Sequence, residues 1–135
     1  MTSSHKIILG IGCDRGTSLE TLETALDRAL ILARKTRDAV AGLATIDKKR
    51  DESGLLALSA RYGWPIRFYD AARLSKVAVP TPSEMVRGHM GTPGVSEAAA
   101  ILAASVGTEG LLLKKWKCRG DDGKNVTVAI ARVSA

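Results

Sequence analysis

Aromatic residues are few in this chain, which holds two tryptophans, two tyrosines and one phenylalanine among 135 residues. Proteins that bind single-stranded nucleic acid stack bases on aromatic side chains, so this scarcity disfavours a nucleic-acid partner. The chain also lacks an apolar run of the ~20 residues that a membrane-spanning helix needs. Its start, Met1–Lys6, is polar and leads into a short apolar stretch with no cleavage signal. We therefore expect a cytoplasmic protein without a membrane partner.

Metal-binding and redox patterns are missing as well. Cys13 and Cys118 lie far apart and in no C-x-x-C pair, and His5 and His89 have no metal-like spacing to them. We expect two free thiols and no metal site. The chain has no P-loop and no complete dinucleotide fingerprint, because Arg15 stands in the place of the third glycine, so we also expect no cofactor.

Positive charge is what the chain has in excess: 20 lysines and arginines against 14 acidic residues give a net charge of +6. Such an excess favours an anionic partner, which can be nucleic acid, a membrane surface or a polyanionic small molecule. Nucleic acid and a membrane are disfavoured by the few aromatic residues and by the lack of a long apolar run. A solvated surface explains much of the charge, and a small polycarboxylate ligand would explain the rest.

Apolar runs and helical periodicities alternate along the chain and predict a single domain, residues 1–135. Runs at 6–12, 40–46 and 65–69 are typical of short strands, and an apolar stripe that includes Leu19, Leu22 and Leu26 indicates a helix between the first two. This alternation predicts parallel strands with crossover helices. Runs at 111–117 and 126–133, joined by an Asp-Gly step, add a hairpin. The predicted fold is a three-layer α/β/α domain with a mixed, mainly parallel sheet and a C-terminal β-hairpin.

Capping residues predict where the helices begin and end. Thr17 and Glu20 form a capping box, and the helix that they start is expected to run to about Arg37. A second helix is expected to begin at Asp51 or Ser53 and to extend to Tyr62, before Gly63. Further helix starts are expected at Asp70, at Ser83, and at Thr92 with Pro93 before a helix over 95–105.

A glycine-rich turn joins the first predicted strand to the first helix. Backbone N–H groups of such a turn can approach an anion, and the helix N-terminus adds a favourable dipole. The charge of Arg15 can pair with a carboxylate or a phosphate. A tight turn without a ligand explains the pattern equally well. The predicted ligand-binding residues of this turn are Gly12, Cys13, Arg15, Gly16 and Thr17.

Two other segments contain candidate binding residues. Thr45 and Lys49 belong to a charged run at the end of the second strand, at the sheet edge where the glycine turn is also expected. Ser83 and Gly94 lie at two predicted helix starts, whose N-termini favour anions. A solvated charge run explains the first segment without a ligand, and helix capping alone explains the second.

These segments together resemble the CobE/CbiG C-terminal domain family of cobalamin biosynthesis. The matching stretches, in order and spacing, are Gly10–Cys13, Arg15–Thr17, Ala44–Asp47 with Lys49 and Glu52, Gly54–Leu55, Pro82–Ser83, Gly94–Ala100, Leu112–Lys115 and Thr127–Arg132. The resemblance implies a protein of the corrin-ring stage that takes an anionic tetrapyrrole, either a precorrin or a hydrogenobyrinic-acid-like ring. The acetate and propionate carboxylates of such a ring suit the positive charge of the chain.

The resemblance implies two activities. Members that resemble CbiG open a δ-lactone on a cobalt-precorrin and release a two-carbon aldehyde, and they carry additional N-terminal regions. This chain starts a few residues before its first strand and looks like the stand-alone CobE type, for which a non-catalytic corrinoid carrier is the alternative. Candidate bases for lactone opening are Glu52, Glu97 and Asp14. A homodimer, or contact with other corrin-pathway enzymes, is left open.

Two functions outside this family remain as alternatives. A nucleotide-binding oxidoreductase would use Asp47, at the end of the second strand, to hold a ribose. An RNA-binding module would use the basic clusters at 48–50 and 114–117. The missing third glycine weakens the former, and the few aromatic residues weaken the latter.

Overall fold

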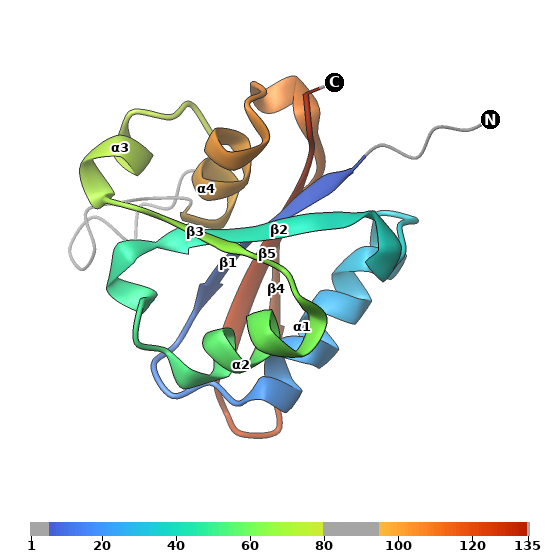
Figure 1. Cartoon of the computed structure of the whole chain (residues 1–135), viewed down its shortest axis with the longest axis vertical. Helices are drawn as coiled ribbons and strands as arrows, with labels where there is room; N and C mark the ends of the chain where they lie inside the picture. The colour runs from blue at the N-terminus through green and yellow to red at the C-terminus, as the bar shows by residue number, and fades with distance from the viewer. Residues whose placement is uncertain (1–5, 80–94, 135) are drawn as a thin grey trace.

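The computed structural model describes residues 6–79 and 95–134. Within these ranges a five-stranded sheet in the order β3-β2-β1-β5-β4 carries helices on both faces (Figure 1). The strands are β1 (Ile7–Cys13), β2 (Val40–Ile46), β3 (Ile66–Tyr69), β4 (Leu111–Arg119) and β5 (Asn125–Arg132). The helices are α1 (Leu19–Leu32), α2 (Ser53–Tyr62), α3 (Ala71–Ser75) and α4 (Val95–Ala104), with short 3-10 turns η1 (Arg37–Ala39), η2 (Asp47–Lys49) and η4 (Thr108–Gly110).

The sheet is mixed and mainly parallel, as predicted. β2 pairs in parallel with β1 and with β3, whereas β5 is antiparallel to both of its neighbours, β1 and β4. β5 therefore runs against all the other strands. The connection between β4 and β5 is the predicted C-terminal hairpin, and β1 lies at the centre of the sheet. The three-layer α/β/α prediction is confirmed.

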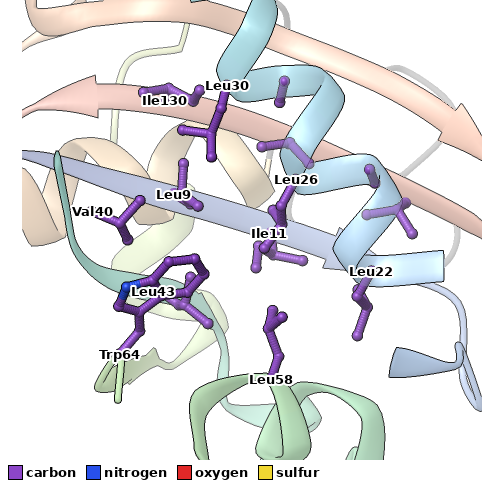
Figure 2. Close-up of a cluster of buried hydrophobic side chains, with 14 of the residues drawn as sticks. Leu9, Ile11, Leu22, Leu26, Leu30, Val40, Leu43, Leu58, Trp64 and Ile130 are labelled. Carbon is purple, nitrogen blue, oxygen red and sulfur yellow. The ribbon is translucent and has the colours of Figure 1, made fainter. Parts of the chain in front are cut away.

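Large apolar side chains fill the space between the sheet and the helices α1 and α2. Figure 2 shows Leu22, Leu26 and Leu30 of α1 on the side of the helix that faces Leu9 and Ile11 of β1. Their spacing of four residues places them on one helical stripe, which is why this face is buried. Each buried leucine or isoleucine contributes about 1.5–3 kcal/mol relative to an exposed one.

Alanine dominates the other face of the sheet, beneath α3 and α4. Ala98, Ala99 and Ala100 of α4 are fully buried and pack with Ala129 and Ala131 of β5. Small side chains let the helix backbone approach the strands closely, so this layer is thin. No helix in the described ranges has the length and apolar character to cross a membrane.

The first helix begins and ends at residues other than those predicted. Ser18, not Thr17, is its N-cap: the Ser18 Oγ accepts a hydrogen bond from the Thr21 N–H at 3.1 Å. The helix ends at Leu32, earlier than Arg37, because Arg34 adopts a left-handed φ of 59° and the Lys35 N–H donates to the Leu30 carbonyl. Glycine usually occupies such a position. Because arginine occupies this position instead of glycine, the sequence does not indicate that the helix ends here.

The second helix also starts differently from the prediction. Its N-cap is Glu52 rather than Asp51 or Ser53, and the Glu52 side chain makes no hydrogen bond to the first turn of its own helix. The helix stop at Gly63, with a φ of 70°, is confirmed, as is the Asp70 cap on α3, which accepts from the Arg73 N–H at 2.7 Å. The predicted starts at Ser83 and at Thr92 with Pro93, and the candidate Gly94, lie outside the described residues.

Candidate functional site

The carboxyl ends of β1 and β2 bring the first two predicted segments together. The β1–α1 connection (14–18) and the β2–α2 connection (47–52) lie side by side at this edge of the sheet (Figure 1). The β4–β5 turn borders the β1–α1 connection on its other side, through hydrogen bonds from Ser18 to Asp122 and from Asn125 to Asp14. Parallel neighbours end at the same edge, which is where α/β sheets usually bind ligands.

Glu52 links the two connections. Its side chain is only 4% exposed, its Oε1 accepts the Gly16 N–H at 3.1 Å, and its Oε2 accepts from Arg15 Nη1 at 2.6 Å. The glycine turn therefore already holds a carboxylate, which comes from the start of α2. A buried carboxylate needs such donors, because leaving it without them would cost several kcal/mol.

Backbone geometry makes this contact possible. Gly16 has a φ of 78°, in the left-handed region that side chains other than glycine rarely adopt, and this aims its N–H at Glu52. Gly54, in the first turn of α2, lies against the Thr17 carbonyl oxygen, and a Cβ at this position would overlap that oxygen. Both glycines are therefore needed to bring the start of α2 against the β1–α1 turn.

Arg15 contacts a second carboxylate as well. Its Nη1 donates to Asp51 Oδ1 at 2.9 Å in addition to Glu52, and its Nη2 reaches the Lys48 carbonyl at 3.5 Å, the limit of a hydrogen bond. The Arg15 side chain is 61% exposed and that of Asp51 is 77% exposed. Hydrogen bonds from Arg15 hold the pKa of the Asp51 carboxyl below its ordinary value.

Other polar groups near the start of α1 also bond to the protein itself. The Ser18 N–H donates to Asp122 Oδ2 at 3.1 Å, and Asp14 Oδ2 accepts from both the backbone and the side chain of Asn125. Thr17 is buried, and its hydroxyl donates to the Asp14 carbonyl at 2.6 Å. These bonds close the glycine turn around the chain's own polar groups.

Cys13, Thr45 and Gly12 lie beneath the turn. Cys13 is half-buried, and burial foremost raises the pKa of its thiol; Glu52 and Asp14 raise it further, while Lys49 and a hydrogen bond with Thr17 lower it. The thiol is therefore protonated at neutral pH. Thr45 is buried and its hydroxyl donates to the Ile11 carbonyl at 2.6 Å, which joins β1 to β2. Gly12 accepts from the Thr127 hydroxyl at 3.3 Å.

An open depression of about 530 Å³ lies over the β2–α2 connection. Its lining residues are Arg15, Asp47, Lys48, Lys49, Arg50 and Asp51. Lys48, Lys49 and Arg50 pair with no carboxylate in the part of the chain that the structure describes. Arg50 instead stacks over the Phe68 ring, with 5.6 Å from its Cζ to the ring centroid. Three cations without ion-pair partners make this depression a receptive surface for anions.

Comparison with known proteins identifies the family. The family described as "Cobalamin synthesis G C-terminus" matches residues 7–131. The Protein CobE of a Sinorhizobium species is 35% identical over 109 residues, which cover 79% of this chain and 70% of that protein. This chain belongs to the cobalamin synthesis G C-terminus family.

A longer relative and a solved structure give the same result. The cobalt-precorrin-5A hydrolase of Priestia megaterium is 35% identical over 127 residues. The match covers 94% of this chain but only 32% of that enzyme, so the chain spans about a third of the relative's length. The crystal structure of CobE, a protein of the cobalamin pathway, superimposes with a TM-score of 0.77 at 33% identity and covers 99% of this chain and 94% of that one. The predicted resemblance is confirmed, and the chain is a cobalamin biosynthesis protein of the CbiG/CobE type.

In this CbiG/CobE-type domain the three candidate bases do not lie together. Asp14 and Glu52 flank the glycine turn, whereas Glu97 belongs to α4 on the opposite face of the sheet. Glu97 is fully buried, and its Oε2 accepts the Lys115 N–H of β4 at 2.8 Å. The structure therefore gives Glu97 a role in fixing α4 to β4.

Sequence reasoning missed three residues that surround the turn. Asp122 and Asn125 belong to a stretch interpreted only as a hairpin, and Asp51 to a charged run and a possible helix cap, yet all three bond to the β1–α1 connection. No local signal marks such contacts, because they join segments that are distant in the sequence. The mixture of acidic and basic residues in 47–52 is the one available hint for Asp51. No group of three or more potential metal ligands occurs among the described residues.

Proposed function

We propose that this chain binds a carboxylate-bearing tetrapyrrole of the corrin pathway at the depression over the β2–α2 connection. The observation that carries the proposal is the group of cations Lys48, Lys49 and Arg50, which have no carboxylate partner in the described ranges and lie beside Arg15. A ring with several carboxylate arms can contact several of these cations at once. The membership in a cobalamin biosynthesis family supports this ligand class.

The open shape of the depression also suits such a ligand. A corrinoid is large and flat, so only part of it can enter a shallow surface, and its carboxylates project from the rim of the ring. Exposed charge–charge contacts are screened over about 8 Å at physiological ionic strength. Affinity should therefore fall as salt concentration rises.

The proposal is tested by titrating the protein with hydrogenobyrinic acid and following the visible bands of the ring. Replacing Lys48 and Lys49 together with alanine should weaken binding roughly tenfold, because two exposed ion contacts of up to about 1 kcal/mol each are lost. The matched control is the pair Lys35→Ala and Arg132→Ala, which removes the same charge at the opposite edge of the sheet. An affinity that is insensitive to salt and equal in both double variants contradicts the proposed site.

Lactone opening is the second candidate function, and one feature of Asp14 favours it. Both hydrogen bonds from Asn125 reach Asp14 Oδ2, so in the described part of the chain Oδ1 accepts no hydrogen bond. Glu52 is less suited as a base, because each of its oxygens already accepts a bond. The Asp14 Oδ1 could take a proton from a water that attacks a lactone carbonyl.

Aldehyde release from a cobalt-precorrin lactone separates the enzyme from the carrier. If the chain opens the lactone, wild type releases the two-carbon aldehyde and Asp14→Asn loses at least about a hundredfold in rate. Asp121→Asn, a neighbouring exposed carboxylate in the β4–β5 turn, is the control and should retain the rate. Binding of the tetrapyrrole without aldehyde release supports the carrier instead.

The dinucleotide alternative is weakened by the contacts of the glycine turn. A pyrophosphate would need the N–H groups at the start of α1, but Gly16 and Ser18 already donate to Glu52 and Asp122. Asp47 does line the depression, as that alternative required. Bound NADP(H) in stoichiometric amount in the purified protein would favour the oxidoreductase over our proposal.

A further inference from the structure

Arg15 is shared between two carboxylates that differ in how firmly they are held. Glu52 is 4% exposed, and its second oxygen accepts the Gly16 N–H, so both ends of this carboxylate are fixed by the fold. Asp51 is 77% exposed, lines the depression and bonds to the rest of the described chain through Arg15 Nη1 at 2.9 Å. One partner is therefore structural, and the other lies at the surface.

The Asp51 contact can be exchanged at little cost. Ion pairs between exposed side chains contribute little to stability, because water and salt compensate for their loss. Breaking the contact with Glu52 would instead leave a buried carboxylate without a cation. A ligand carboxylate that reaches Arg15 from the depression would thus displace Asp51 and leave Glu52 in place.

We propose that Arg15 receives one carboxylate arm of the tetrapyrrole and that Asp51 occupies this position when no ligand is bound. This inference rests on the proposed function and adds a specificity element to it. Among the described residues Lys48 and Lys49 make no ion pair and Arg50 stacks over the Phe68 ring, whereas Arg15 is held in orientation by Glu52. Arg15 therefore selects the position of one arm, and the three other cations attract the remaining arms without fixing the register of the ring.

Asp51 acts as an internal competitor in this arrangement. The lowered pKa of its carboxyl keeps it charged over the whole neutral range, so the competition does not depend on pH there. A ligand arm that carries an amide in place of a carboxylate offers the guanidinium only an uncharged acceptor, so it competes poorly with Asp51. The site then discriminates between corrinoids whose arms are acids and those whose arms have been amidated.

The test compares two neutralising variants by titration with hydrogenobyrinic acid. Asp51→Asn should raise the affinity about two- to fivefold, because the internal competitor is removed. Asp47→Asn is the matched control: it removes the same charge from the lining of the same depression, but Asp47 does not bond to Arg15. The gain in affinity from Asp47→Asn should be smaller, since this change only makes the electrostatic potential of the depression more positive and frees no contact of Arg15.

A second background shows whether the gain depends on Arg15. Arg15→Ala alone risks unfolding through the unpaired Glu52, so the background is Arg15→Ala with Glu52→Gln, checked by thermal melt. In this double-variant background, the gain in affinity from Asp51→Asn should be no larger than the gain from Asp47→Asn. Arg15→Lys keeps the charge but loses the planar fork, and should bind more weakly than wild type. Cobinamide, whose arms are amides, should show no gain from Asp51→Asn.

The outcomes separate this inference from the proposed function. Equal gains from Asp51→Asn and Asp47→Asn, persisting without Arg15, overturn the exchange while tetrapyrrole binding stands. Wild type and Asp51→Asn both failing to bind hydrogenobyrinic acid overturn the proposed function and this inference together. Binding by Asp51→Asn alone supports the competitor role of Asp51.

Discussion

The two connections at the carboxyl edge of the sheet differ in what their polar groups bond to. In the β1–α1 connection, the N–H groups of Gly16 and Ser18 donate to Glu52 and Asp122. In the β2–α2 connection, Lys48 and Lys49 have no carboxylate partner among the described residues. The first connection is closed by the protein's own carboxylates, and the second leaves its two lysines without a carboxylate in the described ranges.

This difference changes how a glycine turn before a helix is interpreted. Such a turn has the donors and the dipole to bind an anion, but the chain itself can supply the anion from a neighbouring loop. Here that supply comes from Glu52, which follows the neighbouring strand β2 and lies 36 residues from Gly16 in the sequence. Unpaired cations, rather than the turn, then indicate where an external anion binds.

The difference between the two connections can be tested by removing, one at a time, the side chains that bond to the β1–α1 connection.

Glu52→Ala should have the largest effect. It removes a buried carboxylate that accepts from the Gly16 N–H and from Arg15, and we expect a loss of about 1–3 kcal/mol in the free energy of unfolding, measured in urea. Asp51→Ala is the control, because Asp51 also contacts Arg15 but is exposed, and it should leave the unfolding midpoint nearly unchanged. Similar midpoints for the two variants would mean that Glu52 does not hold the turn.

Ser18→Ala should have an intermediate effect. It removes the side-chain acceptor of the Thr21 N–H at the first turn of α1, and the expected loss is about 1 kcal/mol in the same measurement. Ser18→Asn, which can still cap the helix, should restore most of it. If Ser18→Ala unfolds at the wild-type midpoint, the cap contributes nothing measurable.

The same residue shows how far the sequence predicts the fold. The capping box placed the helix start within one residue, but two adjacent hydroxyl residues, Thr17 and Ser18, compete for the cap. The outcome depends on Thr17 being buried and bonded to the Asp14 carbonyl, which is a property of the folded turn. The parallel first strands and the C-terminal hairpin were predictable, because apolar runs alternate with helical stripes and an Asp-Gly step marks the turn. The order of the strands in the sheet was not predicted.

The sequence predicts at which edge of the sheet the candidate residues lie, but not which side chains bond to one another there. Parallel strands that end at one edge put Arg15 and Lys49 near each other, and the sequence showed both. That Arg15 would bond to Glu52 and Asp51 was not visible, because side-chain pairing across the edge depends on where α2 begins. Arg34 is a similar case: its left-handed backbone ends α1 without a glycine to indicate it.

Asp122→Asn should have the smallest effect, and its size should depend on pH. Asp122 accepts from the Ser18 and Lys124 N–H groups, and the bond from Ser18 foremost lowers the pKa of its carboxyl below the ordinary 3.8. Because the pKa is lower in the folded state, the ionised carboxylate stabilises the fold at pH values above 3.8, and this contribution is lost as the pH falls through the folded-state pKa. The variant should therefore melt about 1–3 °C below wild type at pH 7 and approach it near pH 2. Asp121→Asn, the exposed neighbour, controls for the change in net charge. A difference between Asp122→Asn and wild type that is the same at both pH values would show that the carboxylate charge at the start of α1 plays no part in closing the turn.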